Sequence, residues 1–141
     1  MKKRLLYLLL PIITLILEIL PYGAVLHFGH LSPDLTLYEY TETFSYFDLI
    51  PFGYANITPL LTAAVTCIIL ILLLVYLFTG ITKTITATKI FLCIGVALSL
   101  CPLLFGISYF SVVGALITIS LISEFVLLLV TVTAQRNMKT V

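Results

Sequence analysis

The chain has 141 residues, of which 62% are hydrophobic and only 9% are charged. A soluble domain usually carries about 25% charged residues, because its surface must remain solvated. This composition excludes an ordinary soluble globular protein, a disordered chain and a nucleic-acid-binding protein. The net charge of +1 conceals an uneven distribution of basic and acidic residues, from which the topology can be predicted.

Four charge-poor runs are long enough to cross a membrane as helices, since a hydrocarbon core of roughly 30 Å requires about 20 apolar residues. They cover about residues 5–28, 60–79, 85–105 and 109–134. Pro102 and Gly106 divide the last two runs, because both residues favour a tight hairpin over one continuous helix. We therefore predict an all-α membrane protein, in which residues 1–141 form a single four-transmembrane-helix bundle with a long first extracellular loop.

The basic residues predict the orientation of this bundle, since lysine and arginine near helix ends are retained on the cytoplasmic side. They all lie on one side of a four-span bundle: Lys2, Lys3, Arg4, Lys83, Lys89, Arg136 and Lys139. Four acids lie in the long loop on the other side: Asp34, Glu39, Glu42 and Asp48. We expect a multi-pass protein of the plasma (cytoplasmic) membrane with both termini in the cytoplasm. The basic start resembles a signal peptide, but Tyr22 lies where cleavage requires a small residue, so we expect an uncleaved first span.

The external loop, about residues 30–59, is rich in aromatic side chains that would form an external cap. These are Tyr38, Tyr40, Phe44, Tyr46, Phe47, Phe52 and Tyr54. Tyr, Thr and Phe between residues 37 and 46 favour a strand, so we predict partial β character, as a short strand or hairpin over the helix ends. A strand would place Tyr38, Tyr40, Glu42, Phe44 and Tyr46 on one face. The loop is then either a lid anchored by an aromatic belt at the membrane surface or a binding surface for a partner.

Two acids lie well inside the predicted spans. Counted at 1.5 Å per residue, Glu18 and Glu124 lie roughly 20 and 15 Å from the cytoplasmic edge, on antiparallel helices and at similar height. Thr66 and Ser99 fall at roughly 21 Å by the same count, so we predict an intramembrane polar layer of Glu18, Thr66, Ser99 and Glu124. Two neighbouring carboxyls could share a proton or coordinate a cation. Alternatively, each carboxyl donates a hydrogen bond that holds the helices together.

The sequence contains no combination of residues typical of catalysis. It has no glycine-rich phosphate loop, no Cys-x-x-Cys pair and no nucleophile beside a histidine and an acid, so we expect neither enzyme activity nor a cofactor. His27 and His30, at the outer end of the first span, would share a helix face, but they lack the third ligand that a metal site needs. Cys67, Cys93 and Cys101 lie within the predicted helices, where unpaired cysteine acts as a small apolar residue.

Two stretches resemble small uncharacterised four-helix membrane proteins of Gram-positive bacteria: Leu17-Glu-Ile-Leu-Pro-Tyr-Gly-Ala-Val-Leu26 and Phe44-Ser-Tyr-Phe-Asp-Leu-Ile-Pro-Phe-Gly-Tyr-Ala-Asn-Ile-Thr-Pro59. This resemblance implies a bacterial plasma membrane and no particular activity. The layout of four spans with a long first external loop is also similar to that of claudins. The chain departs from claudins in having no tryptophan and no loop cysteines, so claudin adhesion is not implied.

The sequence thus predicts an integral membrane protein that acts as a non-enzymatic interaction or accessory protein and presents an aromatic-acidic external cap. The alternative is a small proton- or cation-coupled transporter or channel subunit that uses Glu18 and Glu124. The expected partners are the lipid bilayer and either another membrane protein or further copies of the chain, with no nucleic acid.

Overall fold

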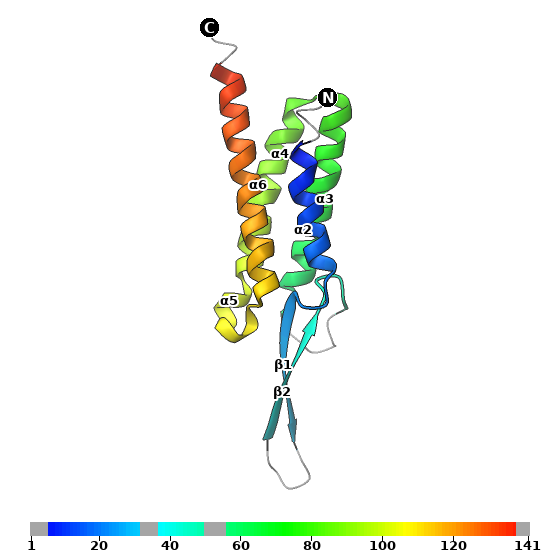
Figure 1. Ribbon diagram of the computed structural model, residues 1–141, viewed down its shortest axis with the longest axis vertical. Helices are drawn as coiled ribbons and strands as arrows, with labels where there is room; N and C mark the ends of the chain where they lie inside the picture. The colour runs from blue at the N-terminus through cyan, green and yellow to red at the C-terminus, as the bar shows by residue number, and fades with distance from the viewer. Residues whose placement is uncertain (1–5, 32–36, 50–55, 138–141) are drawn as a thin grey trace.

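The computed structural model describes residues 6–31, 37–49 and 56–137, with the side chains of residues 6–30, 37–49 and 56–131. Four helices form an elongated bundle, and a β-hairpin projects from one end of it (Figure 1). α2 begins and α6 ends at the opposite end. The elements in chain order are η1 (Leu6–Leu8), α2 (Leu9–Ile19), β1 (Ala24–Leu31), β2 (Leu37–Phe44), α3 (Thr58–Thr79), α4 (Thr82–Leu100), α5 (Pro102–Phe105), η2 (Ile107–Tyr109) and α6 (Val112–Asn137).

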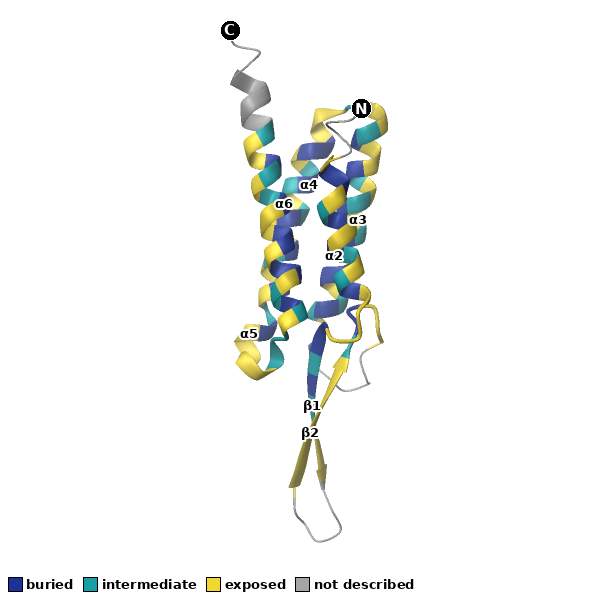
Figure 2. Ribbon diagram, in the orientation of Figure 1, coloured by how far each residue is buried: buried dark blue, intermediate teal, exposed yellow. Residues whose placement is uncertain are grey.

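Three helical stretches are long and apolar enough to cross a membrane: Thr58–Thr79, Thr82–Phe105 and Val112–Thr131. Their outward faces carry large aliphatic side chains, such as Ile71 and Ile119, each of which is 59% exposed. Figure 2 shows exposed residues along the outer faces of the helices and buried residues between the helices. An aliphatic outer surface of this kind belongs in lipid, and the chain therefore has the helices of a membrane-embedded protein.

The first helix is shorter than the predicted span of residues 5–28. Together η1 and α2 cover Leu6–Ile19, about 21 Å at 1.5 Å per residue, against a hydrocarbon core of roughly 30 Å. α2 ends because Pro21 disfavours helical backbone at the preceding Leu20, which has an extended conformation with φ −64° and ψ 138°. The prediction is wrong for the second part of the span, where Ala24–Leu31 forms β1.

The boundaries of the other helices follow from proline and glycine. Pro59 occupies the first turn of α3, and Gly80 ends that helix with a φ of 70°, in the left-handed region that glycine adopts without strain. Pro102 begins α5, and Gly106, with a φ of 135°, separates α5 from η2. These short elements divide α4 from α6, which confirms the turn predicted from Pro102 and Gly106.

β1 and β2 pair as an antiparallel hairpin, with Ala24 opposite Phe44 and Leu31 opposite Leu37. β2 confirms the strand predicted in the external loop, but its partner comes from the segment that was assigned to the first span. Ala24 and Leu26 at the base of β1 are buried, whereas every β2 residue from Leu37 to Thr43 is exposed. β2 therefore projects beyond the helix ends (Figure 2), and the lid interpretation does not hold for it.

Candidate functional site

A pair of hydroxyls joins α2 to α6 inside the bundle. Thr14 Oγ1 and Ser120 Oγ lie 2.7 Å apart, and either can be the donor. Both residues are buried. Because α2 and α6 run in opposite directions (Figure 1), this contact fixes their relative register and allows the heights of the neighbouring polar residues to be compared.

Glu18 lies one helical turn from Thr14, on the side that faces the hairpin. Its Oε1 accepts a hydrogen bond of 2.7 Å from Thr66 Oγ1 of α3, and both residues are almost completely buried. The other carboxyl oxygen, Oε2, is also buried and has no hydrogen-bond partner among the described residues. The structure therefore brings Glu18 and Thr66 together as a contact between α2 and α3.

Ser99 of α4 contacts α6 instead. Thr118 Oγ1 donates a hydrogen bond of 3.1 Å to Ser99 Oγ, and Thr118 precedes Ser120 by two residues. At 1.5 Å per residue, the Ser99 contact lies within about 3 Å of the level of Glu18 along the bundle. Glu18, Thr66 and Ser99 thus lie at similar height, although no hydrogen bond joins Ser99 to the other two.

Glu124 lies one turn from Ser120 on the side away from the hairpin, so it is offset from Glu18. Four residues separate Thr14 from Glu18 and four separate Ser120 from Glu124, which together give about 12 Å along the bundle. Residue counting had placed the two acids at similar height because it assumed that both helices end at one membrane plane. In fact α6 rises beyond the other helices (Figure 1). Both Glu124 carboxyl oxygens are buried without a hydrogen-bond partner in the described part of the chain.

The contribution of Thr14 was missed in the sequence, although a signal was present. Thr14 precedes Glu18 by four residues, and Ser120 precedes Glu124 by four residues. Residues four apart lie on the same face of a helix, so each hydroxyl marks the face that carries the acid. The repeated spacing predicts that these two faces pack against each other.

The hairpin is anchored to the bundle at the end of α2. The main-chain oxygen of Glu18 accepts two hydrogen bonds of 2.9 Å, one from Ser45 Oγ and one from the Tyr46 N–H. Carbonyls in the last turn of a helix lack a helical partner, so the residues that follow β2 satisfy this one. Burial raises the pKa of the Tyr46 phenol above its ordinary value, and the nearby Glu18 adds to the effect. Tyr46 therefore stays neutral and belongs to the core.

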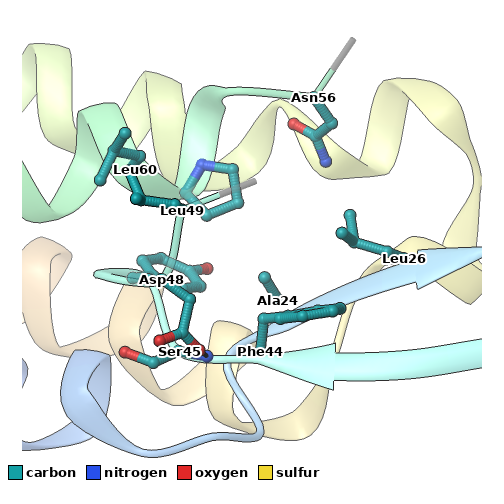
Figure 3. Close-up of a pocket in the computed structure, with 10 residues that line it drawn as sticks. Ala24, Leu26, Phe44, Ser45, Asp48, Leu49, Asn56 and Leu60 are labelled. Atoms are coloured by element: carbon teal, nitrogen blue, oxygen red, sulfur yellow. Dashed lines mark hydrogen bonds between the residues drawn. The ribbon is translucent and has the colours of Figure 1, made fainter. Parts of the chain in front are cut away.

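A second anchor joins the base of β1 to the start of α6. Ser111 Oγ donates a hydrogen bond of 2.6 Å to the Gly23 oxygen and accepts one of 2.8 Å from the Gly114 N–H. His27 Nε2 lies 3.3 Å from the Ser108 oxygen. Where the hairpin meets the start of α3, Figure 3 shows the residues around a cavity of about 10 Å³, which holds at most one water. The base of the hairpin is thus closely packed.

The aromatic residues of the predicted cap have three different placements. Tyr38 and Tyr40 of β2 are 62% and 48% exposed, and Phe44 at the end of β2 is half-buried. Tyr46 turns into the bundle, while Phe47 is exposed. Phe52 and Tyr54 lie outside the described residues. The exposed aromatic surface is therefore centred on β2.

One face of the hairpin is organised by aromatic contacts. Cross-strand neighbours in an antiparallel pair share a face, and Phe28 lies opposite Tyr40 with the rings stacked at 5.3 Å between centroids. Phe28 also contacts Phe44, at 6.5 Å between centroids. These contacts hold the Tyr40 ring in place on the projecting part of the hairpin.

The hairpin end of the molecule carries only acidic formal charges. Glu39 and Glu42 are exposed on β2, and Asp48 follows it. Asp48 Oδ2 accepts a hydrogen bond of 2.7 Å from the Ser45 N–H, so it also stabilises the turn. No lysine or arginine occurs between residues 5 and 82, whereas Lys83 lies in the first turn of α4, at the opposite end of the molecule.

The two candidate metal ligands do not share a face. His27 and His30 lie three residues apart on a strand, where successive side chains point to opposite faces, so the shared helix face expected from the sequence is wrong. Within residues 6–31, 37–49 and 56–137 there is no group of three or more His, Cys, Asp or Glu residues that could hold a metal ion. His27 instead lines an open cleft of about 400 Å³ together with Phe28, Gly29, Glu39, Ser108 and Tyr109.

No protein-family model, curated protein or solved structure matches the chain. The resemblances to small membrane proteins of Gram-positive bacteria and to the claudin layout therefore stay predictions. Function must be inferred from the bundle and the hairpin themselves.

Proposed function

We propose that the chain is a membrane-embedded, non-enzymatic interaction protein whose β-hairpin binds a partner outside the bundle. The observation that carries this proposal is the exposure of β2, where large side chains project into the surroundings. Leu37 and Tyr38 are each more than 60% exposed, and Tyr40 is 48% exposed. Tyrosine is enriched where proteins bind one another, and these exposed side chains contribute little to the core.

The attachment of the hairpin to the bundle supports the same proposal. The hydrogen bonds from Ser45, Tyr46 and Ser111 fix its base to the end of α2 and to the start of α6. A binding segment that is held in one orientation loses less conformational entropy when a partner binds. A closely packed base with an exposed outer part is typical of a rigid binding segment and is not required for a simple connection between helices.

The distribution of charge supports an external position for the hairpin. Basic residues near membrane helices are retained in the cytoplasm, and Lys83 and Lys89 lie on α4 towards the end opposite the hairpin. We therefore propose that the chain lies in the plasma membrane with both termini in the cytoplasm, and that the short first helix forms a fourth crossing. A short helix is accommodated by local thinning of the bilayer.

The proposal is tested by co-purification from native membranes. The tagged full chain is compared with a triple variant, Leu37→Ser with Tyr38→Ser and Tyr40→Ser, and with Ile71→Ala as the control on the lipid-facing surface. We expect a partner to be retained by the wild type and by the control but lost from the triple variant. Equal retention by all three chains would contradict the proposal.

A second candidate function is proton- or cation-coupled transport through the bundle. It is favoured by the two buried acids, because three of their four carboxyl oxygens have no hydrogen-bond partner among the described residues. The offset of about 12 Å between Glu18 and Glu124 requires a relay between them and does not allow them to share one proton directly. Proton flux into vesicles that contain the purified chain tests this candidate. It predicts flux that is lost in both Glu18→Gln and Glu124→Gln, and it fails if the wild type shows none.

A further inference from the structure

β2 is an edge strand with an open side. β1 pairs with one side of it, and in the described part of the chain no strand pairs with the other side. Alternate residues of an edge strand direct their main-chain N–H and C=O groups outwards, where they form a template for another strand. The exposure of β2 from Leu37 to Thr43 leaves this template accessible.

Three common protections of an edge strand, namely proline, lysine and a bulge, are absent from β2. The strand contains no proline and no lysine, and its register with β1 runs from Leu37 to Phe44 without a bulge. Proline, lysine and bulges are the common means by which proteins prevent pairing at an exposed edge. The charged side chains on β2 are those of Glu39 and Glu42, and they determine which strands would be repelled.

The two glutamates disfavour a second copy of this chain as the added strand. If two β2 strands paired antiparallel about their centres, Glu39 of each copy would lie opposite Glu42 of the other. Like charges directly opposite each other destabilise a strand pair, whereas opposite charges stabilise it. No lysine or arginine lies between residues 5 and 82 to offset this repulsion.

We propose that the open edge of β2 binds an extended segment of a partner protein by strand addition, and that this segment carries Lys or Arg opposite Glu39 and Glu42. This inference rests on the proposed function and specifies the binding mode and the charge of the partner. Glu39 and Glu42 are three residues apart and thus lie on opposite faces of the sheet. The two basic residues of the partner are therefore also three apart, and Tyr38 and Tyr40 provide apolar contact beside them.

The test measures the binding of short synthetic peptides to the purified full chain in detergent micelles. The probe alternates Val and Thr and carries two Lys residues three apart, one control has the same composition with adjacent Lys residues, and another carries Glu in place of Lys. We expect the first peptide to bind most tightly and its affinity to fall with added salt. The double variant Glu39→Gln with Glu42→Gln should weaken its binding on the order of tenfold, and Lys83→Gln should leave it unchanged.

The proposal is overturned if the Lys and Glu peptides bind equally, or if the double variant binds the Lys peptide as tightly as the wild type. It is also overturned if a photoreactive group at position 41 joins two copies of the chain, because the edge would then serve self-association. Co-purification distinguishes these failures from a failure of the proposed function. If either peptide result overturns strand addition while a partner is still lost from the Leu37, Tyr38 and Tyr40 triple variant in co-purification, the hairpin binds a protein by another mode.

Discussion

The helical bundle and the β-hairpin distribute polar and apolar residues in opposite ways. In the bundle, hydroxyls such as Thr14 and Thr66 are buried and hydrogen-bonded, while aliphatic side chains such as Ile71 face outwards. In β2, charged, polar and aromatic side chains are exposed together. A lipid environment explains the first arrangement. The second needs an aqueous or protein environment, so the two regions are built for different surroundings.

The residues that stabilise the chain and those available for interactions are therefore in different regions. The buried contacts of the bundle, together with the anchor around Gly23 and Tyr46, should determine whether the protein folds. The outer part of the hairpin contributes little to the core, so its residues should determine what the protein binds. Substitutions in the two regions should therefore have separable effects.

Stability should fall most when a substitution creates a cavity inside the bundle. Leu121 is completely buried, next to Gly95, and Leu121→Ala should lower the free energy of unfolding by ~2–5 kcal/mol, because the lost contacts are not replaced. Denaturant titration in detergent micelles measures this change. The control is Ile119→Ala on the lipid-facing side, for which we expect a change within about 0.5 kcal/mol. An equal loss of stability in the two variants would contradict the burial of Leu121 and the exposure of Ile119.

The contact between Gly23 and Tyr46 joins the hairpin to the bundle, and a single added methyl group there should lower stability. A Cβ at Gly23 would lie 2.8 Å from Cδ1 of the Tyr46 ring, so Gly23→Ala should destabilise the chain by ~1–3 kcal/mol through overpacking. Gly29→Ala is the matched control, because among the described residues a Cβ there would meet only Leu37 Cδ1, at 3.6 Å. Thermal unfolding of the two variants compares them. A midpoint for Gly23→Ala as high as that of the control would contradict the described anchor.

A smaller effect is expected from the hydrogen bond between Thr66 and Glu18. Thr66→Val removes the donor while keeping the shape of the side chain, and the loss should be ~0.6–1.7 kcal/mol, as for other hydrogen bonds between membrane helices. Thr66→Ser keeps the hydroxyl and should recover most of the difference. A double-mutant cycle with Glu18→Met, which removes the acceptor, isolates the coupling between the two residues. A coupling energy of zero would show that the contact does not stabilise the bundle.

The smallest effect on stability should come from the outer part of the hairpin. Tyr38→Ala should change the free energy of unfolding by no more than about 0.5 kcal/mol, because the side chain is exposed. The same variant should retain less of a bound partner than the wild type in co-purification. A loss of stability as large as that of Leu121→Ala would mean that β2 packs against the folded chain.

The helices could be predicted from the sequence because each long apolar run has the length that a bilayer requires. The first run was the exception, because Ala24–Leu31 continues its apolar composition into a strand. An apolar segment of this kind does not distinguish a helix from a strand, and the break at Leu20 and Pro21 was the local signal. β1 also requires β2 as a pairing partner, and such pairing cannot be predicted from one segment alone.

The candidate site could be predicted only in part, for a similar reason. The sequence singled out Glu18 and Glu124 as acids within apolar helices, and both are buried, but it did not determine the rotation and relative height of their helices. The contact between Glu18 and Thr66 joins residues 48 positions apart, so it depends on how α2 and α3 pack. The exposure of Tyr38 and the burial of Tyr46, which lie close together in the sequence, also follow from where the chain turns back into the bundle.

We expect the hairpin, and not the lipid-facing surface of the bundle, to contact a partner protein. Photo-crosslinking in the native membrane tests this, with a photoreactive phenylalanine placed at position 38 in one chain and at position 71 in another. Both positions are exposed to a similar extent, so the two chains differ only in what surrounds the probe. We predict a discrete protein adduct from position 38 and none from position 71. An adduct from position 71 alone, or no protein adduct from position 38, would contradict the claim.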